Sequence, residues 1–100
     1  MPLTIQEAQA LLKEIPSWIL SPDSKNISKQ FKFRNFAEAL AFTNQVGEIA
    51  EAEGHHPGIA LLWGKVGVTL STHAIGGLSE NDFILAAKID QISSTSRLVA

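Results

Sequence analysis

The sequence predicts an α+β domain in which three helices pack on one face of a four-stranded antiparallel sheet, in the order α-β-β-α-β-β-α. Three observations predict this fold. Apolar residues recur at helical spacing in three segments, they alternate with other residues in the segments between, and a glycine-containing turn joins the last two strands. A chain of 100 residues has the length of one domain, so residues 1–100 are predicted to form a single domain.

The first helix is predicted over residues 4–15. Thr4 and Glu7 have the spacing of a capping box, in which each side chain bonds the backbone N–H of the other, and a proline ends the helix. A short strand then begins at Trp18. A second strand is predicted over residues 27–33, because its apolar side chains alternate with polar ones as in a half-buried antiparallel strand.

A long helix is predicted to begin at Asn35, a residue type that caps helices well, and to end at Gly54, because glycine readily takes the left-handed conformation that ends many helices. Two further strands are predicted over residues 59–63 and 66–71. The turn between them is placed at residues 64–65, since a two-residue hairpin turn of one common type begins with glycine.

The last helix has a clear start in the sequence. Ser79 is predicted to be the N-cap, and Leu78 before it and Phe83 after it have the spacing of a hydrophobic staple. An apolar stripe then follows at helical spacing, formed by Leu85, Ala86, Ile89 and Ile92.

Composition excludes several classes of function. The net charge of −2 gives no basic surface for a phosphate backbone, so we expect no direct nucleic-acid binding. No apolar stretch approaches the roughly 20 residues that cross a bilayer, and no secretory signal is visible, so we expect a cytoplasmic protein without membrane contact. Apolar residues make up 45% and charged residues 18% of the chain, which favours a homo-oligomer that covers part of this apolar surface.

All three histidines lie in two short segments, Gly54-His55-His56-Pro57 and Ser71-Thr72-His73. The predicted hairpin pairs residues near Gly58 with residues near Ser71, which brings His73 to the same end of the sheet as His55 and His56. Histidine is the side chain whose ordinary pKa lies nearest to neutrality, so three together indicate proton-transfer chemistry.

Other interpretations of these residues remain open. Three histidines can hold a catalytic zinc, but the helical i, i+4 pair that usually presents two of them is missing, and we expect no metal. Glu51 could orient a histidine, whereas Glu53 fits a solvated residue better. Trp18 could stack on a flat ligand or belong to the core, and the residues alone leave both possibilities.

One set of residues extends along most of the chain: Trp18, the segment 31–42, Glu51-Ala52-Glu53-Gly54-His55-His56-Pro57, Lys65-Val66, Leu70-Ser71-Thr72-His73, Gly77-Leu78-Ser79, Asp82, Ala86 and Ile89-Asp90. This set resembles the sequence pattern of the pterin-4a-carbinolamine dehydratase family, and the spacing from the paired histidines to the third is its most specific part. The fold that the resemblance implies has the element order predicted above.

The resemblance implies a lyase, 4a-hydroxytetrahydrobiopterin dehydratase, that removes water from 4a-hydroxytetrahydropterin and yields quinonoid dihydropterin. Such an enzyme recycles the cofactor of an aromatic amino-acid hydroxylase; the pterin is its substrate, and no cofactor is expected. By resemblance His55, His56 and His73 are catalytic, with His56 and His73 transferring protons and His55 binding or assisting. Four residues are expected to bind substrate: Glu51, Trp18, Ser71 and Thr72.

Two positions depart from the family pattern, Gly54 and Ile59, and both adjoin the expected site. The resemblance also implies an alternative role, because some relatives act as a dimerisation cofactor of a transcription factor or as an assembly chaperone. Those roles need an interaction surface and do not need the histidines. The resemblance further implies a homodimer or homotetramer, and we expect its subunits to meet along the apolar stripe of the last helix.

Overall fold

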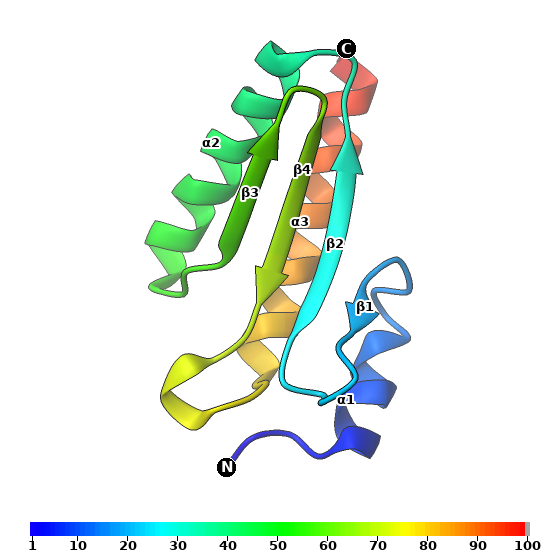
Figure 1. Ribbon diagram of the computed structural model, residues 1–100, viewed down its shortest axis with the longest axis vertical. Helices are drawn as coiled ribbons and strands as arrows, with labels where there is room; N and C mark the ends of the chain where they lie inside the picture. The colour runs from blue at the N-terminus through cyan, green and yellow to red at the C-terminus, as the bar shows by residue number, and fades with distance from the viewer. Residues whose placement is uncertain (100) are drawn as a thin grey trace.

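A computed structural model describes the backbone of residues 1–99 and the side chains of residues 1–92. Figure 1 shows the arrangement of its elements, which follow the predicted order. The helices are α1 (Ile5–Leu12), α2 (Phe36–Glu53) and α3 (Glu80–Val99), the strands are β1 (Ile19–Leu20), β2 (Ile27–Lys32), β3 (Gly58–Leu62) and β4 (Lys65–Leu70), and a single 3₁₀ turn, η1 (His73–Ile75), follows β4.

The four strands form one antiparallel sheet in the order β1-β2-β4-β3. Figure 1 looks onto the open face of this sheet, and α3 lies behind it. The predicted α+β fold, with its four-stranded sheet and three helices, is confirmed. None of the described helices is both long and apolar enough to cross a membrane.

The hairpin turn lies one residue earlier than predicted. Leu62 pairs with Lys65, so the two turn residues are Trp63 and Gly64, and Gly58 pairs with Thr69. Neither turn residue has a positive φ, and the reason for glycine is a close approach: a Cβ on Gly64 would lie 3.0 Å from the carbonyl oxygen of Phe33. The turn was predicted because glycine adopts backbone conformations that other residues avoid. In the structure the glycine is needed because it has no side chain that would collide with Phe33.

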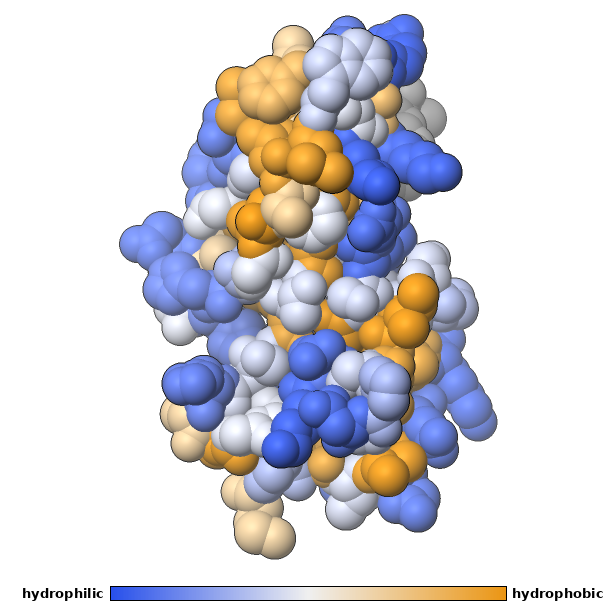
Figure 2. Space-filling model, in the orientation of Figure 1, coloured by the Kyte–Doolittle hydropathy of each residue, from blue (hydrophilic) through white to orange (hydrophobic). Residues whose placement is uncertain are grey.

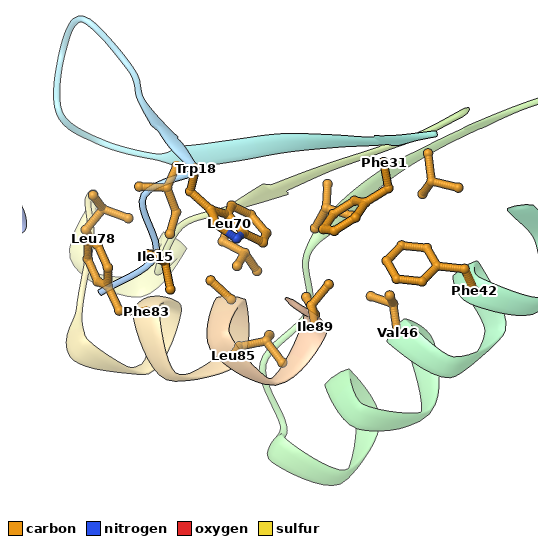
Figure 3. Close-up of a cluster of buried hydrophobic side chains, with 14 of the residues drawn as sticks. Ile15, Trp18, Phe31, Phe42, Val46, Leu70, Leu78, Phe83, Leu85 and Ile89 are labelled. Carbon is orange, nitrogen blue, oxygen red and sulfur yellow. The ribbon is translucent and has the colours of Figure 1, made fainter. Parts of the chain in front are cut away.

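The core lies between the sheet and the helices (Figure 3). Val66, Val68 and Leu70 alternate along β4 and are buried, and Ile27 and Phe31 lie beside them on β2. Phe31 contacts the ring of Phe42 on α2, with 4.7 Å between ring centroids. This alternation buries one face of the sheet and leaves the other open.

Two of the three predicted helix starts have the predicted side-chain caps, whereas the Ser79 hydroxyl bonds Thr72 and does not cap α3. The Thr4 hydroxyl accepts from the Glu7 N–H and the Glu7 carboxylate accepts from the Thr4 N–H, which completes the predicted capping box. The Asn35 side chain caps α2 through the N–H of Glu38, and Gly54 ends that helix at φ 65°.

Adjacent positions at the start of α3 test how this helix packs. Phe83 is 5% exposed in the core, whereas Ile84 beside it is 46% exposed. We expect Phe83→Ala to lower the free energy of unfolding by about 3–5 kcal/mol, because it removes a buried ring and leaves a cavity. Urea unfolding measures this change. Ile84→Ala is the matched control and should change the free energy by no more than about 0.5 kcal/mol; equal effects of the two substitutions would contradict this packing.

Candidate active site

The end of α2 directs two histidines into the site. Gly54 adopts the left-handed conformation, and the N–H of His55 donates to the carbonyl of Ala50 at 3.0 Å. This closing bond reverses the chain as a common helix-ending motif does. The segment His55-His56-Pro57 therefore leaves the helix in a fixed direction and leads straight into β3.

His55 is held by a buried carboxylate. Its Nε2 lies 2.5 Å from Oδ1 of Asp82 on the first turn of α3, and the His55 side chain is 15% exposed. Asp82 is fully buried and is the one buried polar or charged residue among the described side chains. A buried carboxylate needs hydrogen-bond donors on its oxygens, so this contact fixes the orientation of the ring.

The other oxygen of Asp82 joins α3 to the loop after β4. Oδ2 accepts from the Thr72 hydroxyl at 2.8 Å and from the Ser79 backbone N–H at 2.9 Å, and the Thr72 and Ser79 hydroxyl oxygens lie 2.6 Å apart. An ionised carboxylate only accepts, so Thr72 gives its single hydrogen to Asp82 and Ser79 must donate to Thr72. The network therefore satisfies every member, and among the described side chains no buried polar atom lacks a partner.

His56 has a different environment. Its Nε2 lies 2.5 Å from Oε2 of Glu51 one turn back on α2, but the two side chains are 65% and 76% exposed. Glu51 thus contacts a histidine, as the sequence allowed, and the pair is exposed to solvent. Exposed pairs of this kind hold a side chain only weakly, so the His56 ring is accessible to water or a ligand. Glu53, in contrast, pairs with Lys88 of α3 at 2.6 Å.

His73 is exposed at the start of η1, directly after Thr72. The loop is closed at its base, where Thr72 N–H donates to the Gly77 carbonyl at 2.7 Å, and at its tip by Gly76, at φ 68°. In Figure 1 this loop and the α2–β3 loop lie at the same end of the sheet. Because Asp82 binds both His55 and Thr72, it ties the two histidine segments together.

The structure contradicts the predicted ligand contact of Trp18, and it shows that the Thr72 hydroxyl already has protein partners. Trp18 is 2% exposed and lies in the core, where its Nε1 donates to both carboxylate oxygens of Asp90 at 3.1 Å. The prediction that its ring binds the substrate is therefore wrong, because a buried ring offers no free face. Thr72 has its hydroxyl committed to Asp82 and Ser79, whereas Ser71 is exposed and remains a predicted contact.

Asp82 matches the family pattern in the sequence, but no role in the site was predicted for it. A signal for it exists, since Ser79 and Asp82 have the spacing of a capping box, and the Ser79 N–H does donate to the Asp82 carboxylate. What the spacing could not show is that the second oxygen of this carboxylate reaches a histidine 27 residues earlier.

Two of the histidines each contact a carboxylate of their own: His55 contacts Asp82, and His56 contacts Glu51. Within the part of the chain whose side chains are described, no three His, Cys, Asp or Glu residues are grouped so that they could hold a metal ion. What the arrangement offers is one fixed imidazole and two exposed ones at the same end of the sheet.

Comparisons with known proteins agree with this arrangement. Residues 1–92 match the family described as pterin 4 alpha carbinolamine dehydratase. The chain is 50% identical over 93 residues to a protein of Methylococcus capsulatus and, over the same length, to one of Halorhodospira halophila, covering 93% of this chain and 82% and 85% of the relatives. Both relatives are provisionally named pterin-4-alpha-carbinolamine dehydratases.

Two solved structures have a similar fold. A transcriptional coactivator/pterin dehydratase from Brucella melitensis superposes with a TM-score of 0.88 at 32% identity, covering 93% of this chain and 99% of that one. A pterin dehydratase-like protein, described as a RuBisCO assembly factor in the alpha-carboxysome, gives 0.67 at 26% identity, covering 77% and 89%. With the family match over residues 1–92, these relatives show that the chain belongs to the pterin-4a-carbinolamine dehydratase family.

Proposed function

We propose that this protein removes water from 4a-hydroxytetrahydropterin and yields quinonoid dihydropterin, as a carbon–oxygen lyase. The observation that carries the proposal is the buried contact between His55 and Asp82, beside the segments that bear His56 and His73. The family membership supports dehydratase chemistry in general. The proposal adds the acid–base mechanism, a cytoplasmic setting and a link to an aromatic amino-acid hydroxylase.

The reaction needs two proton transfers. The 4a-hydroxyl leaves as water once an acid has protonated it, and a base takes a proton from a ring nitrogen of the pterin, so the net loss is one water. Positioned imidazoles can supply both groups, and general acid–base catalysis of this kind contributes about 10²–10⁴-fold in rate. No redox partner is required, because neither step changes the number of electrons on the pterin and water together.

The three histidines divide this work according to their surroundings. Because the Asp82 carboxylate accepts from Nε2–H of His55, the neutral ring keeps a lone pair on Nδ1, at the atom turned away from Asp82. In the proposal His55 uses this fixed nitrogen to bind the pterin or assist the base, and Asp82 is a positioning residue. His56 and His73, which are exposed, exchange protons with the substrate.

A second candidate function is a non-catalytic one, as a dimerisation cofactor or an assembly factor. The names of the two similar structures favour it, since one is a transcriptional coactivator as well as a pterin dehydratase and the other is a RuBisCO assembly factor. This function would use an interaction surface and would leave the histidines without a role. Substitution of a histidine therefore separates the two candidates.

Substitution of His56 tests the proposed reaction. Wild-type protein should accelerate the dehydration of freshly generated 4a-hydroxytetrahydropterin over the spontaneous rate, and His56→Ala should lose about 10²–10⁴-fold of kcat. Its thermal unfolding midpoint should stay unchanged, because the side chain is 65% exposed. Glu53→Ala is the control in the same region and should keep full activity. Wild-type turnover by His56→Ala would remove His56 from the mechanism, and no acceleration by wild type would favour the assembly role.

The protonation of the His55 ring tests the positioning role of Asp82. Nitrogen-15 NMR of the wild type should show the neutral His55 ring with its hydrogen on Nε2. Asp82→Asn should weaken this preference, because an amide can present either an acceptor or a donor to the ring. His56 is the internal control and should not change. A wild-type His55 ring with its hydrogen on Nδ1 would contradict the proposed role.

A further inference from the structure

One apolar surface gathers at the end of the sheet opposite the histidines. Figure 2 shows it at the upper left, over the β3–β4 turn and the start of α2, where Trp63 is 69% exposed. The apolar stripe of α3, which was expected to join subunits, is instead buried in the chain's own core through Leu85, Ala86 and Ile89. Within one chain, the contacts that hold the histidine segments must therefore lie at the other end of the sheet.

The N-terminal segment, residues 1–4, lies against the loop that carries His73. The N–H of Leu3 donates to the carbonyl of Leu78 at 2.9 Å, and in Figure 1 the N-terminus lies at the same end of the sheet as η1. The segment is anchored where it joins the fold, because Thr4 caps α1 and the Leu3 side chain packs against the core. It therefore contacts the loop from a fixed base.

Gly77 is the point where this segment meets the loop most closely. A Cβ on Gly77 would lie 2.9 Å from the Cβ of Pro2 and 3.5 Å from its Cγ, and the first distance is too short for two carbon atoms. Gly77 has no positive φ, unlike Gly76 beside it, so its backbone conformation does not require glycine. The sequence showed Gly77 only as part of the family pattern. Its physical reason in this chain is that the missing side chain makes room for the Pro2 ring.

Gly77 also forms the base of the loop together with Thr72. The N–H of Thr72 donates to the carbonyl of Gly77 at 2.7 Å, and the reverse bond, from the N–H of Gly77 to the carbonyl of Thr72, is 3.5 Å long. The chain thus bonds to Thr72 through residue 77 and to Leu3 through residue 78, as a strand between two neighbours does. Because His73 directly follows Thr72, a shift of Gly77 is transmitted to the backbone of His73.

The position of His73 depends on its backbone. His55 and His56 each contact a carboxylate, whereas the His73 side chain has no hydrogen bond or ion pair with any described residue. A displacement of about 1 Å at a catalytic group can cost about 10²-fold in rate, so the placement of this loop matters for proton transfer. We propose that Pro2 and Leu3 are positioning residues for His73 and form a clamp that sets where the loop presents this imidazole to the pterin. This inference rests on the proposed function for the role of His73, whereas the clamp itself does not.

Amide hydrogen exchange tests the clamp without reference to activity. Pro2 is exposed, so Pro2→Gly should fold normally, and loss of the ring should speed exchange of the Thr72 amide at least about tenfold. Gly77→Ala should have the same effect, because its methyl group and the Pro2 ring cannot both fit. The double variant should regain protection, since the methyl group then occupies the space that the ring has left.

Gly47→Ala is the matched control for this measurement. A Cβ on Gly47 would have no neighbour within 4 Å, so this substitution should leave the exchange of the Thr72 amide unchanged. Wild-type exchange of the Thr72 amide in Pro2→Gly would overturn the clamp. A double variant that exchanges faster than both single variants would overturn the contact between Pro2 and Gly77 as its basis.

Steady-state kinetics test whether the clamp acts through His73. Pro2→Gly should lower kcat for the dehydration of 4a-hydroxytetrahydropterin about tenfold and change KM less than about twofold, because a proton-transfer group is displaced and binding groups are not. In a His73→Ala background the same substitution should cause little further loss. Wild-type kcat in Pro2→Gly, or an equal loss in the His73→Ala background, would overturn the positioning role. No acceleration by wild type would remove the proposed function and with it this role, while the exchange result would still decide the clamp.

Discussion

The buried carboxylate of Asp82 is the constraint on which the candidate site depends. A fully buried charge is costly unless each oxygen has donors, and here the donors come from three separate segments: His55 after α2, Thr72 after β4 and Ser79 at the start of α3. Each segment is therefore held in place by the needs of the same side chain. The charge is also well placed, since a carboxylate on the first turn of a helix lies close to the positive end of the helix dipole.

The rest of the fold brings these three segments within reach of Asp82. The antiparallel pairing of β3 with β4 sets the start of one strand beside the end of the other, which brings the residues before Gly58 near those after Leu70. Asp90, eight residues farther along α3 and so about 12 Å from Asp82 along the axis, binds Trp18 and Lys29 and helps anchor the core. The two acidic residues of α3 thus have separate tasks, one structural and one at the site.

Much of this arrangement could be predicted from the sequence, because it depends on interactions between residues that are close together in the chain. Capping residues such as Thr4 and Asn35 and the alternation along β2 and β4 are readable one segment at a time. The location of Trp18 could not be read this way. A tryptophan beside a strand fits either a ligand wall or the core, and the choice depended on a partner, Asp90, that is 72 residues distant. The link from His55 to Asp82 depended in the same way on tertiary contact.

The central claim is that Asp82 acts through His55, and a double-mutant cycle on the dehydration rate tests it most directly. The measurement compares kcat/KM for wild type, His55→Ala, Asp82→Asn and the double variant, each checked for folding by thermal melts. If Asp82 serves catalysis chiefly by orienting His55, the double variant should lose much less activity, in free energy, than the sum of the two single losses, and any further loss beyond His55→Ala should be the small one due to the Thr72 loop. Losses that add up in free energy would show that Asp82 acts independently of His55, and would contradict the account.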